Sequence, residues 1–200
     1  MKSFFKMFAD SAKEIKNIRC IAVTGIFIAI SVAIEMFSID IGYAKLNFAF
    51  LAIAVIGMLF GPTVGFAAGL ACDALGFIVH PSGGAFLPIY TLVAGFQGII
   101  YGVCLYQKYT KPINVGGKDI SLVVRATVAR LLDVVVINLL INTKLNLHYH
   151  FIPDSAYGAA IKARLVKNVV ELAADLPLLF IILPVCLISY KRMNVGRKTA

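Results

Sequence analysis

Six long apolar segments set the strongest limit on how this chain can fold. They cover residues 18–39, 45–61, 63–79, 87–107, 121–143 and 157–189. The chain is 60% hydrophobic and 14% charged, whereas a soluble domain carries roughly 25% charged residues. One water-facing core cannot bury such a surplus, and backbone in lipid must satisfy its own hydrogen bonds. The sequence therefore predicts an all-α integral membrane protein with six transmembrane helices, preceded by a short amphipathic helix.

The segment before the first apolar stretch, residues 1–17, mixes aromatic and basic residues at helical spacing. This spacing predicts an amphipathic helix on the membrane surface, and an ordinary solvated tail is the alternative. Residues 18–190 then form the six-helix membrane domain, and residues 191–200 form a basic tail.

Lysine and arginine predict the orientation of the chain. They concentrate near both ends and in the fourth connection, 108–120. The predicted outer connections are 40–45, 80–86 and 144–156. These hold only Lys45 and Lys144, whereas cytoplasmic loops are the ones enriched in basic residues. We therefore expect a multi-pass protein of the cytoplasmic membrane with both termini in the cytoplasm.

The last apolar segment contains polar residues at positions i, i+3, i+4, i+7 and i+11. They are Arg164, Lys167, Asn168, Glu171 and Asp175. At 100° per residue they share one stripe that faces the bundle. An ionisable group within a membrane costs about 2.5–3.5 kcal/mol on insertion scales. The stripe is therefore either an internal ion-pair ladder or the wall of a cavity for a charged or hydrogen-bonding ligand.

The fifth segment adds two polar pairs. Asn138 and Asn142 are four residues apart, so they either bind a ligand or join helices by hydrogen bonds. Arg130 and Asp133 are expected to pair with each other or with neighbours in a structural role.

Acidic residues also occur in the first and third segments. Asp73 lies within the series Gly65, Gly69 and Gly76, which lets a neighbouring helix approach closely. Glu35 ends the first segment, where it faces either water or a cavity.

The first segment carries small residues four positions apart, at Gly25, Ala29 and Ala33. Such a stripe docks another helix, either within the chain or from a partner subunit.

The stretch between the third and fourth segments contains two prolines and two adjacent glycines, which exclude a continuous helix. We expect this stretch, 75–90, to form a lid over an outward-facing cavity. The candidate ligand contacts within it are His80, Pro81, Ser82, Gly83, Gly84 and Phe86.

Motifs of catalysis are absent from the sequence. It contains no GxxxxGK[ST] phosphate loop, no HExxH metal motif and no nucleophile elbow. His148 and His150 alone are a weak metal signal. The sequence predicts no enzymatic activity, no cofactor and no metal.

Residues 47–106 resemble the folate family of substrate-binding (S) components of energy-coupling factor (ECF) transporters. The elements GMLFGP, DxxGF, PSGGAF and GxIYG occur in that family's order and spacing, and INLLINTKLN (137–146) and KARLVKN (162–168) resemble its fifth- and sixth-helix signatures. The resemblance implies an outward-facing vitamin pocket closed by the first and third outer loops. It also implies three partners, a membrane coupling protein and two cytoplasmic ATPases, and an S component that topples in the bilayer.

Carried over residue by residue, the resemblance assigns the coupling face to Ala29 and Ala33 and ligand binding to the sixth-helix pair Arg164 and Lys167. Two departures, Glu35 for the family's arginine and Lys144-Leu145 after the fifth-helix Asn-Thr, bear on the choice of ligand. Folate is expected. The alternatives are another water-soluble vitamin, such as a pyridoxine- or thiamine-type ligand, and a structural membrane subunit without transport activity.

Overall fold

The computed structural model describes residues 2–36, 39–40, 45–46, 48–79, 86–115, 118–151 and 157–195. Helices account for most of them. They are α1 (Lys2–Glu14), α2 (Ile18–Met36), α3 (Phe50–Phe60), α4 (Pro62–Val79), α5 (Pro88–Leu105), α6 (Ser121–Leu132), the π-helix η1 (Asp133–Ile141), α7 (Asn142–His148) and α8 (Tyr157–Val195). The predicted all-α architecture is confirmed.

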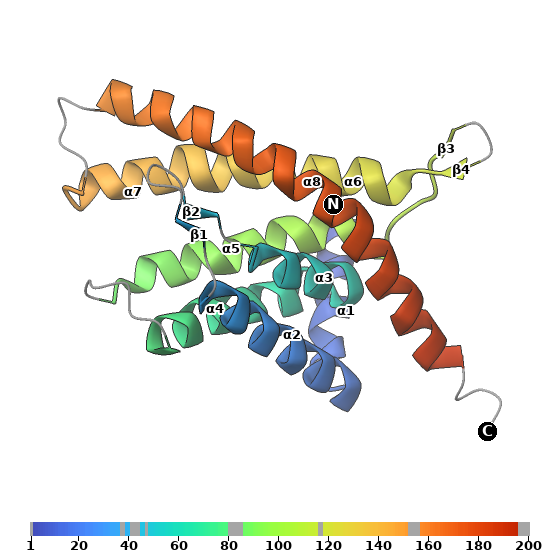
Figure 1. Cartoon of the computed structure of the whole chain (residues 1–200). Helices are drawn as coiled ribbons and strands as arrows, with labels where there is room; N and C mark the ends of the chain where they lie inside the picture. The colour runs from blue at the N-terminus through green and yellow to red at the C-terminus, as the bar shows by residue number, and fades with distance from the viewer. Residues whose placement is uncertain are drawn as a thin grey trace.

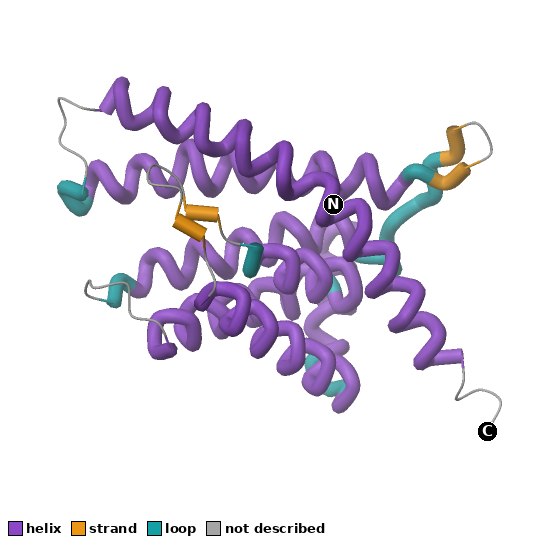
Figure 2. The backbone as a smooth tube through the Cα atoms, in the orientation of Figure 1, coloured by secondary structure: helices purple, strands orange, loops and turns teal. Residues whose placement is uncertain are grey.

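Two short strand pairs interrupt the helical pattern, and the sequence did not predict them. Strands β1 (Ile39–Asp40) and β2 (Lys45–Leu46) pair antiparallel, as do β3 (Asn114–Val115) and β4 (Lys118–Asp119). Both pairs lie in connections between helices (Figure 2). Two residues per strand are too few to give an alternating pattern of apolar and polar residues, so hydropathy does not reveal them.

The helices run back and forth between two ends of the bundle (Figure 1). The end of α2, the end of α4 and the start of α5 lie at one end, together with α7 and the start of α8. The start of α2, the α3–α4 turn, the start of α6 and the end of α8 lie towards the other. Helix α8 contains Pro177 and Pro184, and its axis changes direction along its length.

Helix α3 forms the centre of the core. Ten of its 11 residues are buried, and it contacts α2, α4, α5 and α8. Tyr101 and Leu105 from α5 pack against it, as do Leu179 and Leu183 from α8. An apolar helix that is surrounded on all sides presents no polar face, which is why its sequence shows no amphipathic period.

Glycines bring α4 and α5 into direct contact, as the small-residue series predicted. A Cβ on Gly65 would overlap the carbonyl oxygen of Gly98, and one on Gly69 would overlap that of Ala94. Gly76 has a different neighbour, because a Cβ there would overlap Oε2 of Glu35 on α2. Gly65 and Gly69 therefore allow the backbone of α5 to approach α4, and Gly76 leaves room for the carboxylate of Glu35.

Helix α1 crosses the other helices (Figure 1) and packs on the turn between α3 and α4. The turn needs Gly61, whose φ is 88°, and Gly61 has no side chain with which to cap α4. Ser11 replaces that cap: Thr63 N–H and Val64 N–H donate to its Oγ over 3.0 and 3.2 Å, and its hydroxyl donates to Phe60 O over 2.7 Å. Residues 2–14 are thus a docked helix, so the solvated-tail alternative is wrong.

Among the described residues, four helical segments are long and apolar enough to cross a membrane. They are Ile18–Met36, Pro62–Val79, Pro88–Leu105 and Ile161–Met193. Helix α3 is apolar but spans only about 16 Å at 1.5 Å per residue. The remaining predicted crossing consists of α6, η1 and α7, which follow one another without a break. Six crossings remain a prediction.

Candidate ligand-binding site

Two adjoining cavities lie between the helices, an inner one of about 270 Å³ and an outer one of about 420 Å³. The inner cavity is lined by Ser31, Glu35, Ala49, Phe50, Ile53, Cys72, Asp73, Ala94, Gln97, Arg130, Asn138, Lys167, Glu171 and Asp175. The outer cavity is lined by Tyr90, Asn138, Asn142, Asn146, Arg164, Lys167 and Asn168. Asn138 and Lys167 line both, so the cavities share a wall. Together they fall within the size range of small-molecule sites, about 300–1,000 Å³.

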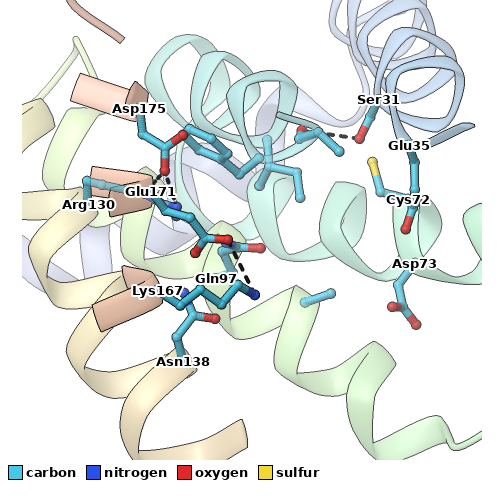
Figure 3. A pocket seen from close by; sticks show the side chains of 14 residues that line it. Ser31, Glu35, Cys72, Asp73, Gln97, Arg130, Asn138, Lys167, Glu171 and Asp175 are labelled. Atoms are coloured by element: carbon cyan, nitrogen blue, oxygen red, sulfur yellow. Dashed lines mark hydrogen bonds and ion pairs between the residues drawn. The ribbon is translucent and has the colours of Figure 1, made fainter. Parts of the chain in front are cut away.

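The two cavities differ in charge. The inner cavity carries two cations, Arg130 and Lys167. Its carboxylates outnumber them and come from Glu35, Asp73, Glu171 and Asp175. The outer cavity carries Arg164 and Lys167 and no carboxylate among its described lining residues. Figure 3 shows the inner cavity from close by, with Arg130, Lys167, Glu171 and Asp175 on one wall and Ser31, Glu35, Cys72 and Asp73 on the other.

One end of the inner cavity is formed by a buried cluster around Arg130. Its guanidinium donates to Oδ2 of Asp175 from Nε and Nη2, over 3.1 and 2.5 Å, and to Oδ2 of Asp133 from Nη1 over 2.5 Å. It also lies 4.1 Å from the ring centroid of Phe50, at cation–π distance. The predicted Arg130–Asp133 pairing is confirmed. Removing one member of such a buried cluster leaves an uncompensated charge, which typically costs about 3–5 kcal/mol.

Asp133 is fully buried and has one oxygen left over. Its Oδ2 also accepts a bond from Gln97 Nε2 over 3.0 Å, but Oδ1 has no hydrogen-bond partner among the described residues. One guanidinium thus faces two carboxylates in this cluster, which leaves the site rich in acceptors. Asp133 lines neither cavity, so the acceptors that a ligand with hydrogen-bond donors could reach are the lining carboxylates Glu35, Asp73, Glu171 and Asp175.

The predicted polar stripe of α8 does face inward, and this orientation is confirmed. Asn168, Glu171 and Asp175 are buried, whereas Arg164 and Lys167 are half-buried. Lys167 Nζ lies 3.3 Å from Oε1 of Glu171, which is part of the predicted ladder. The ladder does not continue to Asp175, which pairs with Arg130 instead.

Arg164 contacts the π-helix η1 and the start of α7 across the outer cavity. Its Nη1 donates to the backbone oxygen of Asn138 and to Oγ1 of Thr143, each over 3.4 Å. Asn142 Nδ2 donates to Oδ1 of Asn138 over 3.4 Å, while Oδ1 of Asn142 is buried without a partner among the described residues. Both roles that the sequence left open for the asparagine pair are therefore compatible with the geometry.

The opposite wall of the inner cavity comes from α2, α4 and α5. Asp73 Oδ2 accepts a 2.6 Å bond from the hydroxyl of Thr91, so α5 holds this carboxylate in place. The carboxylate of Glu35 lies against Gly76, where any side chain would displace it. The sequence left two orientations open for Glu35, towards water or towards a cavity. The structure shows that Glu35 faces the inner cavity.

The centre of the predicted lid, residues 80–85, lies outside the described residues, whereas 75–79 belong to α4 and 88–90 to α5. His80, Pro81, Ser82, Gly83 and Gly84 all lie in that centre. Phe86 is described, and its ring packs against Phe77 at a centroid distance of 5.1 Å rather than lining either cavity.

Sequence reasoning missed four polar residues that line the cavities, namely Ser31, Tyr90, Gln97 and Asn146. Gln97 is a polar residue within an apolar segment, and this position could have indicated that its side chain faces a cavity. Tyr90 and Asn146 are joined by a 2.5 Å bond from the Tyr90 hydroxyl to Asn146 Oδ1. Tyr90 is the last residue of the predicted lid stretch 75–90, and Asn146 is the last residue of the INLLINTKLN signature, but neither was singled out as a ligand contact.

Comparisons with known proteins agree with this arrangement. The sequence model of the family described as ECF-type riboflavin transporter, S component, matches residues 15–183. This chain belongs to the ECF transporter S-component family. A folate transporter, FolT, of Clostridium novyi (strain NT) is 28% identical over 180 residues, covering 88% of this chain and 94% of the relative. The crystal structure of FolT bound with folic acid matches with a TM-score of 0.63 and 27% identity, over 78% of this chain and 88% of that one.

The resemblance drawn from residues 47–106 is therefore confirmed, and so is the expectation that the S component is a transporter subunit rather than an enzyme. The small-residue stripe of α2 is exposed with respect to the described residues. Gly25, Ala29 and Ala33 are all exposed, and a Cβ on Gly25 would have no described atom within 4 Å. Within the described part of the chain, these exposures favour the alternative in which the stripe meets a partner subunit.

Proposed function

We propose that this S component binds folate and delivers it inward on an ATP-driven ECF module. The observation that carries the proposal is the opposite chemistry of two cavities that share a wall. The inner cavity offers carboxylates and amides, and the outer cavity offers Arg164 and Lys167. Folate has the matching polarity: its pterin ring presents amino and ring N–H donors, and its glutamate end carries two carboxylates. Charge-assisted bonds to both ends favour this orientation.

Riboflavin is the second candidate, because the matching family is described by that substrate. Riboflavin has a ring with an imide N–H, which suits the inner cavity, but its ribityl chain is neutral. A neutral chain would leave Arg164 and Lys167 without an anionic partner from the ligand. Lys167 already pairs with Glu171 of the inner cavity, but Arg164 lies in a cavity without a described carboxylate, so an anionic tail is the better fit.

The membrane arrangement follows from the fold and the charge distribution. Basic residues concentrate at the bundle end that holds the start of α2 and the end of α8. We infer that this end faces the cytoplasm, that the chain crosses the cytoplasmic membrane six times, and that both termini are inside. The outer cavity lies between α7 and the start of α8, so it would open away from the cytoplasm.

The exposed stripe of Gly25, Ala29 and Ala33 supports a partner face on α2. Small residues allow the backbone of a second helix to come close, and packing is the main force between helices in lipid. We infer that the membrane coupling protein of the ECF module docks there, with two cytoplasmic ATPases attached to it. The resemblance motivates this assignment, and the uncovered stripe is compatible with it.

Ligand binding to purified protein tests the proposal. Equilibrium dialysis in detergent with folic acid and with riboflavin would give the affinity for each, and we expect folic acid to bind more tightly. Arg164→Ala removes a charge-assisted bond worth about 1.5–3 kcal/mol, so folate affinity should fall roughly 10- to 150-fold. Lys162→Ala is the matched control, because Lys162 is exposed on the same helix and lines neither cavity.

Three results are informative. Loss of folate binding in Arg164→Ala with normal binding in Lys162→Ala supports the proposal. Equal affinities in the two variants remove Arg164 from the site. Tight binding of riboflavin, unaffected by Arg164→Ala, would replace folate with the second candidate.

A further inference from the structure

The circumference of α1 is divided into three sectors with different environments. Met7 and Ser11 are buried against the bundle, and the Ser11 hydroxyl caps α4 as described. The hydroxyl of Thr63 donates to Phe8 O over 2.9 Å, which adds a second attachment to the same turn. One sector of α1 is therefore fixed to the bundle, which leaves two sectors outside it.

The second sector is aromatic and exposed. Phe4 and Phe5 are 49% and 70% exposed, and the Phe4 and Phe8 rings pack at a centroid distance of 5.0 Å. At 100° per residue these three side chains lie on the same flank of the helix, next to the buried sector. Exposed aromatic rings of this kind are unfavourable in water and favourable at a lipid interface.

The aromatic sector continues onto a surface that is suited to hydrocarbon. Ile15 follows α1, and Ile18 and Ile21 on α2 are 81% and 58% exposed. Helix α2 is one of the segments long and apolar enough to cross a membrane. The aromatic flank of α1 thus joins an apolar face that the bilayer itself would cover.

The third sector is basic. Lys6 and Lys13 are exposed on the flank opposite the phenylalanines, and Lys16 is exposed in the following turn. Asp10 marks the edge of this sector, where it accepts a 2.8 Å bond from the Tyr109 hydroxyl and lies 3.4 Å from Lys108 Nζ. Lys13 Nζ also lies 3.8 Å from Oδ1 of Asp10, but one carboxylate cannot neutralise three lysines, so this sector keeps a net positive charge.

We propose that α1 is a lipid-binding helix that inserts Phe4 and Phe5 into one leaflet while Lys6, Lys13 and Lys16 contact anionic headgroups. Apolar insertion beside a row of cations is the pattern of interfacial helices. The attachment through Ser11 ties this helix to the α3–α4 turn, so lipid binding would fix the depth of the bundle in the bilayer. The proposal does not depend on which ligand the cavities bind.

Tryptophan fluorescence tests the placement, because the chain contains no tryptophan. Phe5→Trp and Lys13→Trp, each in the full chain and in vesicles, introduce one reporter on the aromatic and one on the basic sector. With brominated acyl chains we expect strong quenching of the Phe5→Trp variant and weak quenching of Lys13→Trp. Iodide in the buffer should give the reverse order. Iodide quenching of Phe5→Trp as strong as that of Lys13→Trp would overturn the insertion.

Brominated lipids also test the headgroup contact. Vesicles with a minor fraction of brominated phosphatidylglycerol should quench Phe5→Trp at least about twofold more than vesicles with the same fraction of brominated phosphatidylcholine. Replacing Lys6, Lys13 and Lys16 by Gln in the Phe5→Trp background should abolish this preference and leave insertion intact. Equal quenching by both lipids in the parent variant would overturn the anionic-lipid contact.

Discussion

Ser11→Ala tests the unusual capping of α4 from another helix. The substitution removes the acceptor for Thr63 N–H and Val64 N–H and the donor to Phe60 O. Val64 is buried, so its N–H would lose a partner that water cannot easily replace. Loss of an ordinary N-cap costs about 0.5–2 kcal/mol, and an unsatisfied buried group costs about 1–3 kcal/mol. We expect a loss of about 1–3 kcal/mol in the free energy of unfolding.

Thermal unfolding in detergent, followed by circular dichroism, measures the effect. For a chain of this length each kcal/mol lowers the midpoint by about 2–4 °C. Thr127→Ala is the control, because Thr127 is half-buried and its hydroxyl bonds to Val123 O within its own helix, so no contact between helices is lost among the described residues. If Ser11→Ala melts within 1 °C of Thr127→Ala, the hydrogen bonds of Ser11 contribute nothing to the free energy of unfolding. The conclusion that Ser11 caps α4 would then be incorrect.

Two further predictions concern a cavity wall and the attachment of α1. Gly76→Ala should force the Glu35 carboxylate out of its position, and a strained rotamer costs about 0.5–1.5 kcal/mol, so ligand affinity should fall roughly 2- to 12-fold. Gly158→Ala is the control, because a Cβ on Gly158 meets no described atom within 4 Å, and equal affinities in the two variants would contradict this account. The hydrogen bond from Tyr109 and the neighbouring Lys108 lower the pKa of Asp10 below its ordinary value of 3.8. A lowered pKa stabilises the fold above that ordinary value and stops doing so as pH falls through the lower folded-state pKa. The melting temperature of Asp10→Asn should therefore be lower than that of the parent at neutral pH and converge on it in strong acid; a constant difference would refute this linkage.

The regular part of the fold could be predicted from the sequence because lipid imposes simple rules. Apolar length and Gly-Pro breaks located the helices, since backbone in hydrocarbon must form its own hydrogen bonds. The inward stripe of α8 followed from the cost of burying Glu171 and Asp175 without partners. The start of α4 at Pro62 also agreed with the break at Gly61-Pro62.

Other features depended on contacts between distant residues. The fifth segment is partly π-helical, and no residue pattern in 133–141 distinguishes a π-helix from an α-helix. Arg130 was expected to be structural from its spacing to Asp133, and its place in the cavity became clear only when α6 was packed against Asp175 of α8. The docking of α1 depends likewise on Ser11. Its capping role could not be predicted, because the turn that it caps lies about 50 residues further along the chain.

Lys167 lines both cavities, so under the proposed folate assignment the two halves of the ligand would not be recognised independently. A pterin without its glutamate would meet a lysine still paired with Glu171, whereas the intact molecule could draw that lysine towards its own carboxylate. Releasing Glu171 in this way would leave its oxygens available to the ring. Binding energies of the separated fragments should therefore not sum to that of the whole, and truncated analogues should be poorer competitors than their size suggests.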